Sequence, residues 1–282
     1  MLVLENVSKG FGRKKPVLKN ISIRFESGVY GLLGPNGSGK TTLLRCLTKI
    51  YPVSGGTIRF QGEDIARSRS YLSRVGYLPQ EFGLFPELTI MDAMRLFANL
   101  KGVPRSKADA MISDCLSIVN LYESRDQKGG TLSGGMVRRV GIAQALINNP
   151  PILIFDEPTA GLDPEERMRF KNSISQIREG RLILLSTHIV DDVEAVCDSI
   201  AVMREGRFAA YGSCQEIRQI AQNKVYSVPE EKRTEIDGRY HIQKNFEVEG
   251  VPMIRILCEK QQNALTEEPT IEDGYLCALK KI

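Results

Sequence analysis

The chain has 282 residues, of which 42% are hydrophobic and 26% charged, and its formal net charge is +4. This composition is typical of a globular protein with one large domain and a smaller appendage, and the weak positive charge does not indicate nucleic acid binding. The longest apolar runs, such as residues 152–155 and 182–185, have the length of strands and not of membrane spans. Because the N-terminus enters a strand pattern directly, we expect no signal peptide.

The cysteines have irregular spacing, without the close pairs that disulfide frameworks or zinc sites use. We therefore expect reduced and mostly buried thiols. The residues concerned are Cys46, Cys115, Cys197, Cys214, Cys258 and Cys277.

The first elements are strand patterns at residues 2–7, 21–26 and 29–33, followed by a helical pattern through residue 47. Between the third strand and the helix lies the phosphate-binding pattern G-x-x-x-x-G-K-T. Its glycines let backbone N–H groups point at phosphate oxygens, and the helix start, near Ser38 or Gly39, adds a positive dipole end. Lys40 can reach the β- and γ-phosphates, and the Thr41 hydroxyl can ligate Mg²⁺. The predicted nucleotide-binding residues are Gly34, Pro35, Asn36, Gly37, Ser38, Gly39, Lys40, Thr41 and Thr42.

Strand patterns at 57–60 and 74–78 come next, and residues 89–120 have helical periodicity. Thr89 with Asp92 and Ser106 with Asp109 have the spacing of capping boxes. Residues 132–149 predict another helix, 151–155 a buried strand, and Pro164 the first position of a further helix. Strands at 181–186 and 199–203 complete an alternation that predicts a mainly parallel sheet covered on both faces.

Two acids end the buried strand at 151–155. A carboxylate at that strand end lies beside the phosphate-binding loop, so we assign Asp156 to holding Mg²⁺ through water. Glu157 is then placed to orient or deprotonate the attacking water. His188 follows the strand at 181–186, where a neutral imidazole can hold Glu157 and the water in line. The alternatives are a pair of solvated acids and a structural histidine.

Ser133, Gly134 and Gly135 lie at the start of the helix predicted at 132–149, where they offer exposed N–H groups. By itself such a sequence usually marks only a turn with an N-cap. The Ser-Gly-Gly signal becomes specific when it is combined with the other motifs, because their order and spacing resemble those of the ATPase subunit of an ATP-binding cassette (ABC) transporter. The residues that carry the resemblance, within residues 1–212, are Lys40, Gln80, Ser133, Asp156, Glu157, Asp163 and His188.

The resemblance implies an α/β P-loop NTPase fold of the ABC type. It consists of a mainly parallel central sheet, an antiparallel β subdomain and a helical subdomain at about 81–130, with a small C-terminal α+β appendage at 213–282. Gln80 matches the Q-loop, where its amide bridges Mg²⁺ and the attacking water, and Asp163 matches the D-loop. Ser133, Gly134 and Gly135 match the signature that contacts the nucleotide.

Three positions depart from the usual pattern of that family. Phe11 stands where an adenine-stacking tyrosine is usual, and it retains a stacking energy of roughly 1–3 kcal/mol, although a small core aromatic is the alternative. Met136 stands where glutamine is commonest and Gln144 where many relatives have arginine. Neither belongs to the Ser-Gly-Gly sequence, so we expect altered helix contacts and intact hydrolysis.

The resemblance also implies partners. In such ATPases two domains pair head to tail, because Ser133 and Lys40 cannot serve the same nucleotide. A chain with one phosphate-binding loop (P-loop) and one signature therefore requires a second nucleotide-binding subunit, identical or related. Transport further requires a separate membrane permease, which would hold the chain at the cytoplasmic face. No nucleic acid partner is expected. Candidate permease contacts, for which subdomain core packing is equally plausible, are Phe82, Leu84, Phe85 and Leu88.

Beyond residue 212 we expect small strands at 224–228, 239–245 and 252–258 and a helix at 269–280. Residues 263–281 and the Met136 signature resemble bacterial exporter ATPases with separate permeases, which implies export of a drug, antimicrobial peptide, lipid or polysaccharide. The alternative is a non-transport ABC ATPase acting on ribosomes or DNA. Ribosome-acting relatives carry two cassettes in one chain, and DNA-repair relatives have a long coiled coil that this sequence lacks.

Overall fold

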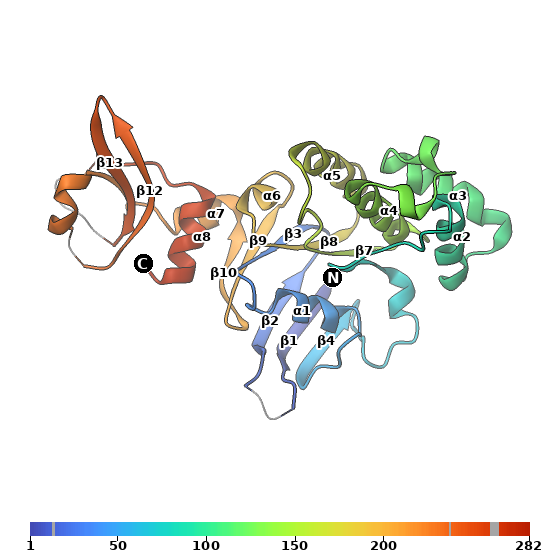
Figure 1. Cartoon of the computed structure of the whole chain (residues 1–282). Coiled ribbons are helices and arrows are strands. Elements are labelled where there is room, and N and C mark those ends of the chain that lie inside the picture. Colours follow the sequence, from blue (N-terminus) through green and yellow to red (C-terminus); the bar gives the residue numbers. More distant parts are fainter. Residues whose placement is uncertain (13–14, 237, 260–264) are drawn as a thin grey trace.

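The computed structural model describes residues 1–12, 15–236, 238–259 and 265–282, and three sheets lie within these residues. In the view of Figure 1, the N-terminal sheet lies below the central sheet, the helical subdomain at the right and the C-terminal sheet at the left. Residues 263 and 264 of the exporter-like segment lie outside the described residues. Within the described residues, the helices are too short or too polar to cross a membrane.

The central sheet has the strand order β10-β9-β3-β8-β7-β6. All neighbours in it pair in parallel except β9 and β10, which are antiparallel. The predicted, mainly parallel sheet is therefore confirmed. Its strands are β3 (Gly28–Leu33), β6 (Val75–Leu78), β7 (Ile152–Asp156), β8 (Leu182–Thr187), β9 (Ser199–Arg204) and β10 (Arg207–Ser213).

Both faces of the inner strands β3, β7, β8 and β9 are largely buried, whereas the edge strand β10 is mostly exposed or half-buried. Successive side chains of each strand point to opposite sides of the sheet. Leu153 and Phe155 of β7 belong to the hydrophobic cluster that contains residues of α4 and α5. Ile152 and Ile154 belong to a second cluster with α1 and the N-terminal sheet. The helices that cover the central sheet are α1 (Lys40–Leu47), α4 (Gly134–Leu146), α5 (Pro164–Ile177) and α6 (Val190–Glu194).

The N-terminal sheet is antiparallel, in the order β2-β1-β4-β5. Its inward side chains pack on α1, so this sheet and the central sheet enclose the helix that follows the phosphate-binding loop. The strands are β1 (Leu2–Lys9), β2 (Leu18–Phe25), β4 (Gly55–Phe60) and β5 (Glu63–Asp64), and a short 3₁₀ turn, Tyr71–Arg74, leads to β6.

The helical subdomain contains α2 (Ile90–Leu100) and α3 (Arg105–Ile118), which pack beside α4. The cap predicted at Thr89 is confirmed, since its hydroxyl accepts a bond from the Asp92 N–H at 3.1 Å. The cap predicted at Ser106 is wrong. Helix α3 begins at Arg105, with Pro104 as its N-cap, two residues earlier than a cap at Ser106 requires. The Asp109 carboxylate instead accepts bonds from Arg95 of α2 at 2.8 and 2.9 Å.

Among the residues described beyond 212, the C-terminal region has a second antiparallel sheet, in the order β12-β13-β11-β14, the α-helices α7 and α8, and a 3₁₀ turn at Glu230–Glu235. Side chains of α7 and α8 join the main hydrophobic cluster, so the region is anchored on the ATPase body. The division at residue 212 remains a prediction. The elements are α7 (Cys214–Gln219), β11 (Val225–Pro229), β12 (Tyr240–Val248), β13 (Val251–Cys258), β14 (Leu265–Thr266) and α8 (Ile271–Lys280).

A buried ion pair joins the C-terminal sheet to α8. The Arg255 guanidinium donates to both Asp273 carboxylate oxygens, at 2.7 and 2.8 Å, and to Glu267 at 2.7 Å. Asp273 is 0% exposed. Burial by itself would raise the pKa of Asp273, but hydrogen bonds from Arg255 and from the Thr270 backbone outweigh it and lower the pKa.

We expect Arg255→Met to lower the free energy of unfolding in urea by about 3–5 kcal/mol, because it leaves a fully buried carboxylate without its partner. The matched control is Arg239→Met at an exposed arginine, with an expected change of about 0.5 kcal/mol or less. A loss below about 1 kcal/mol at neutral pH would contradict the role of the pair.

The pH dependence gives a second check. In the wild type, the lowered pKa of Asp273 stabilises the fold above the ordinary value of 3.8, and this stabilisation is lost as pH falls through the lower folded value. In Arg255→Met the buried Asp273 carboxyl loses its charged partner and keeps, among the described residues, only the bonds from Thr270 and Gln243, so its protonation in the folded state is favoured relative to the wild type. The difference in unfolding free energy between the two proteins should therefore narrow below about pH 4.

Candidate active site

The site forms where three parallel strands end at one edge of the central sheet. In the register of these strands, Leu33 of β3 lies opposite Thr187 of β8, and Asp156 of β7 lies opposite Ser186 of β8. The phosphate-binding loop therefore emerges beside the two acids and beside the loop that carries His188. This is the carboxyl edge at which open α/β sheets bind ligands.

The phosphate-binding loop runs from Gly34 to Gly39 and lines a cavity of about 270 Å³. Helix α1 begins at Lys40 after Gly39, which has a φ of 111° and so suits glycine. A Cβ at Gly34 would lie 2.5 Å from the Met203 carbonyl oxygen, which excludes larger residues there. The buried Ser38 hydroxyl has no hydrogen-bond partner within the described residues. The cavity is lined by Val17, Asn36, Gly37, Ser38, Gly39, Lys40, Thr41, Thr42, Gln80 and Glu157.

Lys40 carries the positive charge of the cavity and is only 5% exposed. Its ammonium donates to the Gly34 carbonyl at 2.7 Å and lies 3.3 Å from Glu157 Oε1. A buried ammonium needs such partners, because an unpaired charge is costly to bury. The same charge, at the start of α1, can attract the phosphate groups of a nucleotide.

Asp156 is fully buried at the end of β7. Its Oδ1 accepts hydrogen bonds from the Ser186 hydroxyl at 2.6 Å and the Thr41 hydroxyl at 3.0 Å. Its Oδ2 is buried and has no partner within the part of the chain that the structure describes. Burial raises the pKa of Asp156, and the two hydroxyl bonds oppose this rise. An orphaned carboxylate oxygen beside a threonine hydroxyl fits a hard cation such as Mg²⁺.

Glu157 is held between two basic groups. Its Oε1 faces Lys40, and its Oε2 lies 3.0 Å from His188 Nδ1. Its backbone has a φ of 48°, in the left-handed region, and its N–H donates to the Ser186 hydroxyl at 3.0 Å. Such a conformation costs about 1–3 kcal/mol and persists only where the surroundings enforce it. A buried carboxylate aimed at the phosphate-binding loop is suited to accept a proton from water.

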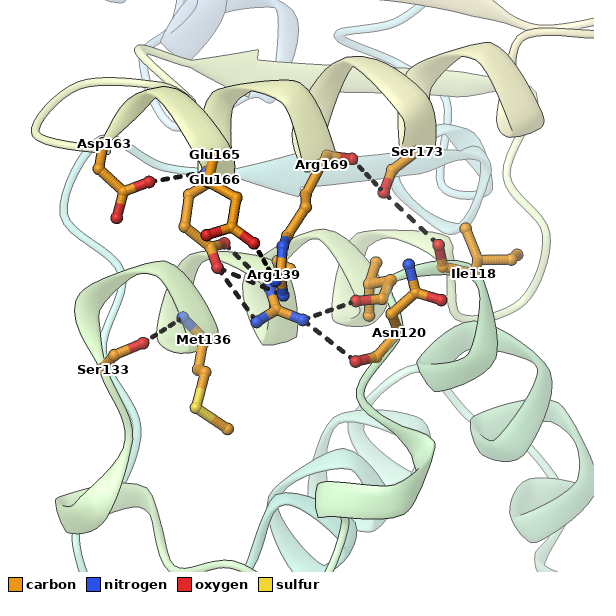
Figure 2. Close-up of polar contacts among 11 residues, drawn as sticks. Ile118, Asn120, Ser133, Met136, Arg139, Asp163, Glu165, Glu166, Arg169 and Ser173 are labelled. Atoms are coloured by element: carbon orange, nitrogen blue, oxygen red, sulfur yellow. Dashed lines mark hydrogen bonds and ion pairs between the residues drawn. The ribbon is translucent and has the colours of Figure 1, made fainter.

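The signature residues do not line this cavity. Ser133 caps α4, where its hydroxyl accepts a bond from the Met136 N–H at 3.1 Å, and Gly134 and Gly135 form the first turn. Asp163 caps α5 in the same way, accepting from the Glu166 N–H at 2.8 Å (Figure 2). Both helix starts are exposed at Ser133 and Asp163, so they are open to a second nucleotide.

Phe11 also lies apart from the cavity lining. It is 40% exposed, and its ring meets that of Tyr51 edge to face at 5.1 Å, with the Lys9 ammonium 4.8 Å from its centre. Val17 lines the cavity instead, a position that the sequence did not indicate. The stacking role of Phe11 remains a prediction.

Two further residues act on the site without having been singled out in the sequence. Ser186 holds both acids through its hydroxyl. Arg138 donates to backbone carbonyls on both sides of the cavity. The signal for Arg138 in the sequence is weak: it and Arg139 are charged residues within a largely apolar stretch of α4, where a charged side chain needs partners if it is buried.

Comparison with known proteins agrees with this geometry. A family model described as "ABC transporter" matches residues 18–160. The "Nod factor export ATP-binding protein I" of Burkholderia lata is 40% identical over 211 residues, which cover 74% of this chain and 69% of that protein.

Solved structures are also similar to this chain. A dimeric ATP-binding cassette in a post-hydrolysis state, bound to ADP and Pi, matches with a TM-score of 0.68 and 26% identity, over 76% of this chain and 98% of that one. A bacterial Atm1-family ABC exporter with ATP bound matches with a TM-score of 0.67 and 28% identity, over 77% of this chain and 39% of that one.

We expect Lys40→Ala to weaken ATP binding at least about 100-fold, because the substitution removes the buried positive charge of the cavity, which is predicted to bind the β- and γ-phosphates. Titration with a fluorescent ATP analogue measures this change. The control is Lys49→Ala, just beyond the far end of α1, where the ammonium donates to the Ser68 carbonyl at 3.0 Å. Unchanged affinity in Lys40→Ala would contradict the assignment of the loop.

Proposed function

The chain belongs to the ABC transporter family and is an ATP-hydrolysing subunit of that family, and we propose that Glu157 and His188 carry its hydrolytic chemistry. The observation that supports this most directly is the position of the Glu157 carboxylate. Its Oε1 lies 3.3 Å from the ammonium of Lys40, which follows the phosphate-binding loop, and its Oε2 lies 3.0 Å from His188 Nδ1. In this position Glu157 can take a proton from the attacking water, a role worth roughly 10²–10⁴ in rate.

The remaining groups of the cavity bind and orient the triphosphate. The loop N–H groups and Lys40 hold the phosphates, and His188 keeps Glu157 in line with the attacking water. We propose that Thr41, Asp156 and Gln80 hold Mg²⁺, which would offset phosphate charge. The unpaired, buried oxygen of Asp156 supports this assignment.

We further propose that two nucleotide-binding subunits pair head to tail. Ser133 and Asp163 are exposed at the N-termini of α4 and α5 and do not line their own chain's cavity. A partner's nucleotide could therefore be contacted by the N–H groups and dipole ends of these helices. ATP would join the two subunits, and hydrolysis would release them.

The direction of transport that the observations favour is export. It would run through a separate membrane-spanning permease that holds this chain at the cytoplasmic face of the membrane. A relative of 40% identity is named a Nod factor export protein, and a similar structure is that of an exporter. A drug, antimicrobial peptide or lipid-like molecule is the proposed cargo class. The helical subdomain is the proposed docking region, where Phe85 is 61% exposed while Phe82 and Leu84 pack against the core.

We expect Glu157→Gln to retain ATP binding, to accumulate an ATP-dependent dimer and to lose hydrolysis by at least about 100-fold, because an amide cannot accept the proton. Steady-state phosphate release and gel filtration with ATP measure these effects. Glu179→Gln, at an exposed acid that precedes β8 while His188 follows that strand, should match the wild type. Near-normal turnover in Glu157→Gln would remove Glu157 from this role.

Purification of the tagged chain from its host in mild detergent should yield a multi-span membrane protein at equal stoichiometry. Phe85→Ser should reduce this recovery, because it removes an exposed apolar contact, whereas Met168→Ser, at a methionine that is 57% exposed on α5, should not. Recovery of ribosomes or DNA-repair proteins instead would contradict the transport proposal and leave the ATPase chemistry standing.

A further inference from the structure

Arg138 of α4 is a buried arginine that joins two loops of the active site. Its side chain is 9% exposed, and each of its three nitrogens donates to backbone carbonyl oxygens. A guanidinium has five N–H groups, and here five carbonyls accept from it. The acceptors are Pro158 at 2.9 Å from Nε, Pro79 at 3.1 Å and Gln80 at 2.8 Å from Nη1, Asp156 at 3.3 Å from Nη2, and Glu157, also from Nη2.

The first group of carbonyls belongs to the Q-loop, directly after β6. Gln80 itself is exposed and lines the cavity beside the phosphate-binding loop. The bonds from Arg138 to Pro79 and Gln80 fix the main chain at the root of this loop. They leave the Gln80 side chain free to reach into the cavity.

The second group belongs to the strained turn after β7. Glu157 has a φ of 48°, and Arg138 donates to the carbonyls of Asp156, Glu157 and Pro158 around it. Strained backbone persists only where its surroundings hold it. The same guanidinium therefore fixes the distance between the turn that aims Glu157 and the loop that carries Gln80.

The neighbouring arginine on the same helix provides a contrast. Figure 2 shows Arg139 bonded to the Glu166 carboxylate of α5, at 3.0 and 3.3 Å, and to the Asn120 carbonyl after α3. These contacts join helices to one another. Arg138 makes no ion pair with a carboxylate within the described residues, and its bonds go to the two loops that bear hydrolytic groups.

We propose that Arg138 is a positioning residue for ATP hydrolysis, which holds Gln80 and Glu157 at a fixed separation through their backbones. This inference rests on the hydrolytic roles proposed above for those two residues. It assigns Arg138 no contact with the nucleotide, so it predicts an effect on turnover and not on ATP affinity. Misplacement of catalytic groups by about 1 Å can cost about 100-fold in rate.

The test is Arg138→Lys in the full chain. A lysine carries its N–H groups on one nitrogen and cannot reach the carbonyls of both loops at once. We expect kcat per folded protein to fall at least about tenfold while KM for ATP stays within about threefold, since the P-loop groups that bind ATP do not contact Arg138. Arg138→Gln is measured in parallel, because its neutral side chain avoids burying a misplaced charge.

The matched control is Lys101→Gln, which removes a half-buried cation from carbonyls at the other end of α4. The Lys101 ammonium donates to the Gln144, Ala145 and Ile147 carbonyls, far along the helix from the site. We expect this variant to lose stability but to keep the wild-type kcat. Equal losses of kcat in both variants would mean that Arg138 acts only by supporting α4, and would overturn the proposal.

A second readout follows the loop itself. The chain has no tryptophan, so Glu81→Trp, next to Gln80 at an exposed position, gives a single fluorescent reporter. Arg138→Lys or Arg138→Gln in this background should lower its fluorescence anisotropy, whereas Lys101→Gln should not. Unchanged anisotropy and kcat would overturn the inference.

Failure of this inference can be told apart from failure of the proposed function. If Arg138 is not a positioning residue, Arg138→Lys will either turn over ATP normally or lose no more kcat than Lys101→Gln, while Glu157→Gln remains inactive. If the hydrolytic assignment itself is wrong, Glu157→Gln will turn over ATP as well.

Discussion

The parallel register of β3, β7 and β8 is the constraint on which the site depends. It sets Leu33 beside Thr187 and Asp156 beside Ser186, so the segments that follow these strands start from one edge of the sheet. More than a hundred residues separate the P-loop from Asp156 along the chain. The ends of β3, β8 and β7 are nevertheless neighbours, because strand pairing and not the length of the connection sets their positions. The helical subdomain can therefore be inserted between them while the site stays intact.

Burial of charge is the second feature that shapes the site. Lys40, Asp156 and Glu157 are all nearly inaccessible, and each has charged or hydroxyl partners at short distance. Ser186 binds the side chain of one acid and the backbone of the next, so one hydroxyl orients both. In such a low-dielectric setting, prearranged charges act strongly on phosphate and need little rearrangement.

Buried arginines connect the parts of this molecule. Arg138 and Arg139 bind carbonyls of the Q-loop, the β7 turn and the end of α3, and Arg255 binds acids that join the C-terminal sheet to α8. The planar guanidinium suits these positions, because it can satisfy several backbone or carboxylate oxygens in fixed directions. The helical subdomain and the C-terminal sheet are thus attached by directional bonds as well as by apolar packing.

The sequence by itself determined the order of most strands and helices, the family, and the residues at the strand ends, because those signals are local: a glycine-rich loop, a strand ending in two acids, a histidine after a strand. It did not predict the strands β5, β10 and β14 or the helices α6 and α7. Only the tertiary structure decided which side chains meet across long separations. The Ser106 cap failed because α3 already begins after Pro104, and Asp109 pairs with Arg95 of the adjacent helix instead. The roles of Ser186 and Arg138 likewise depend on groups distant in sequence, which no spacing within the chain reveals, since contact geometry arises only when the strands and α4 pack together.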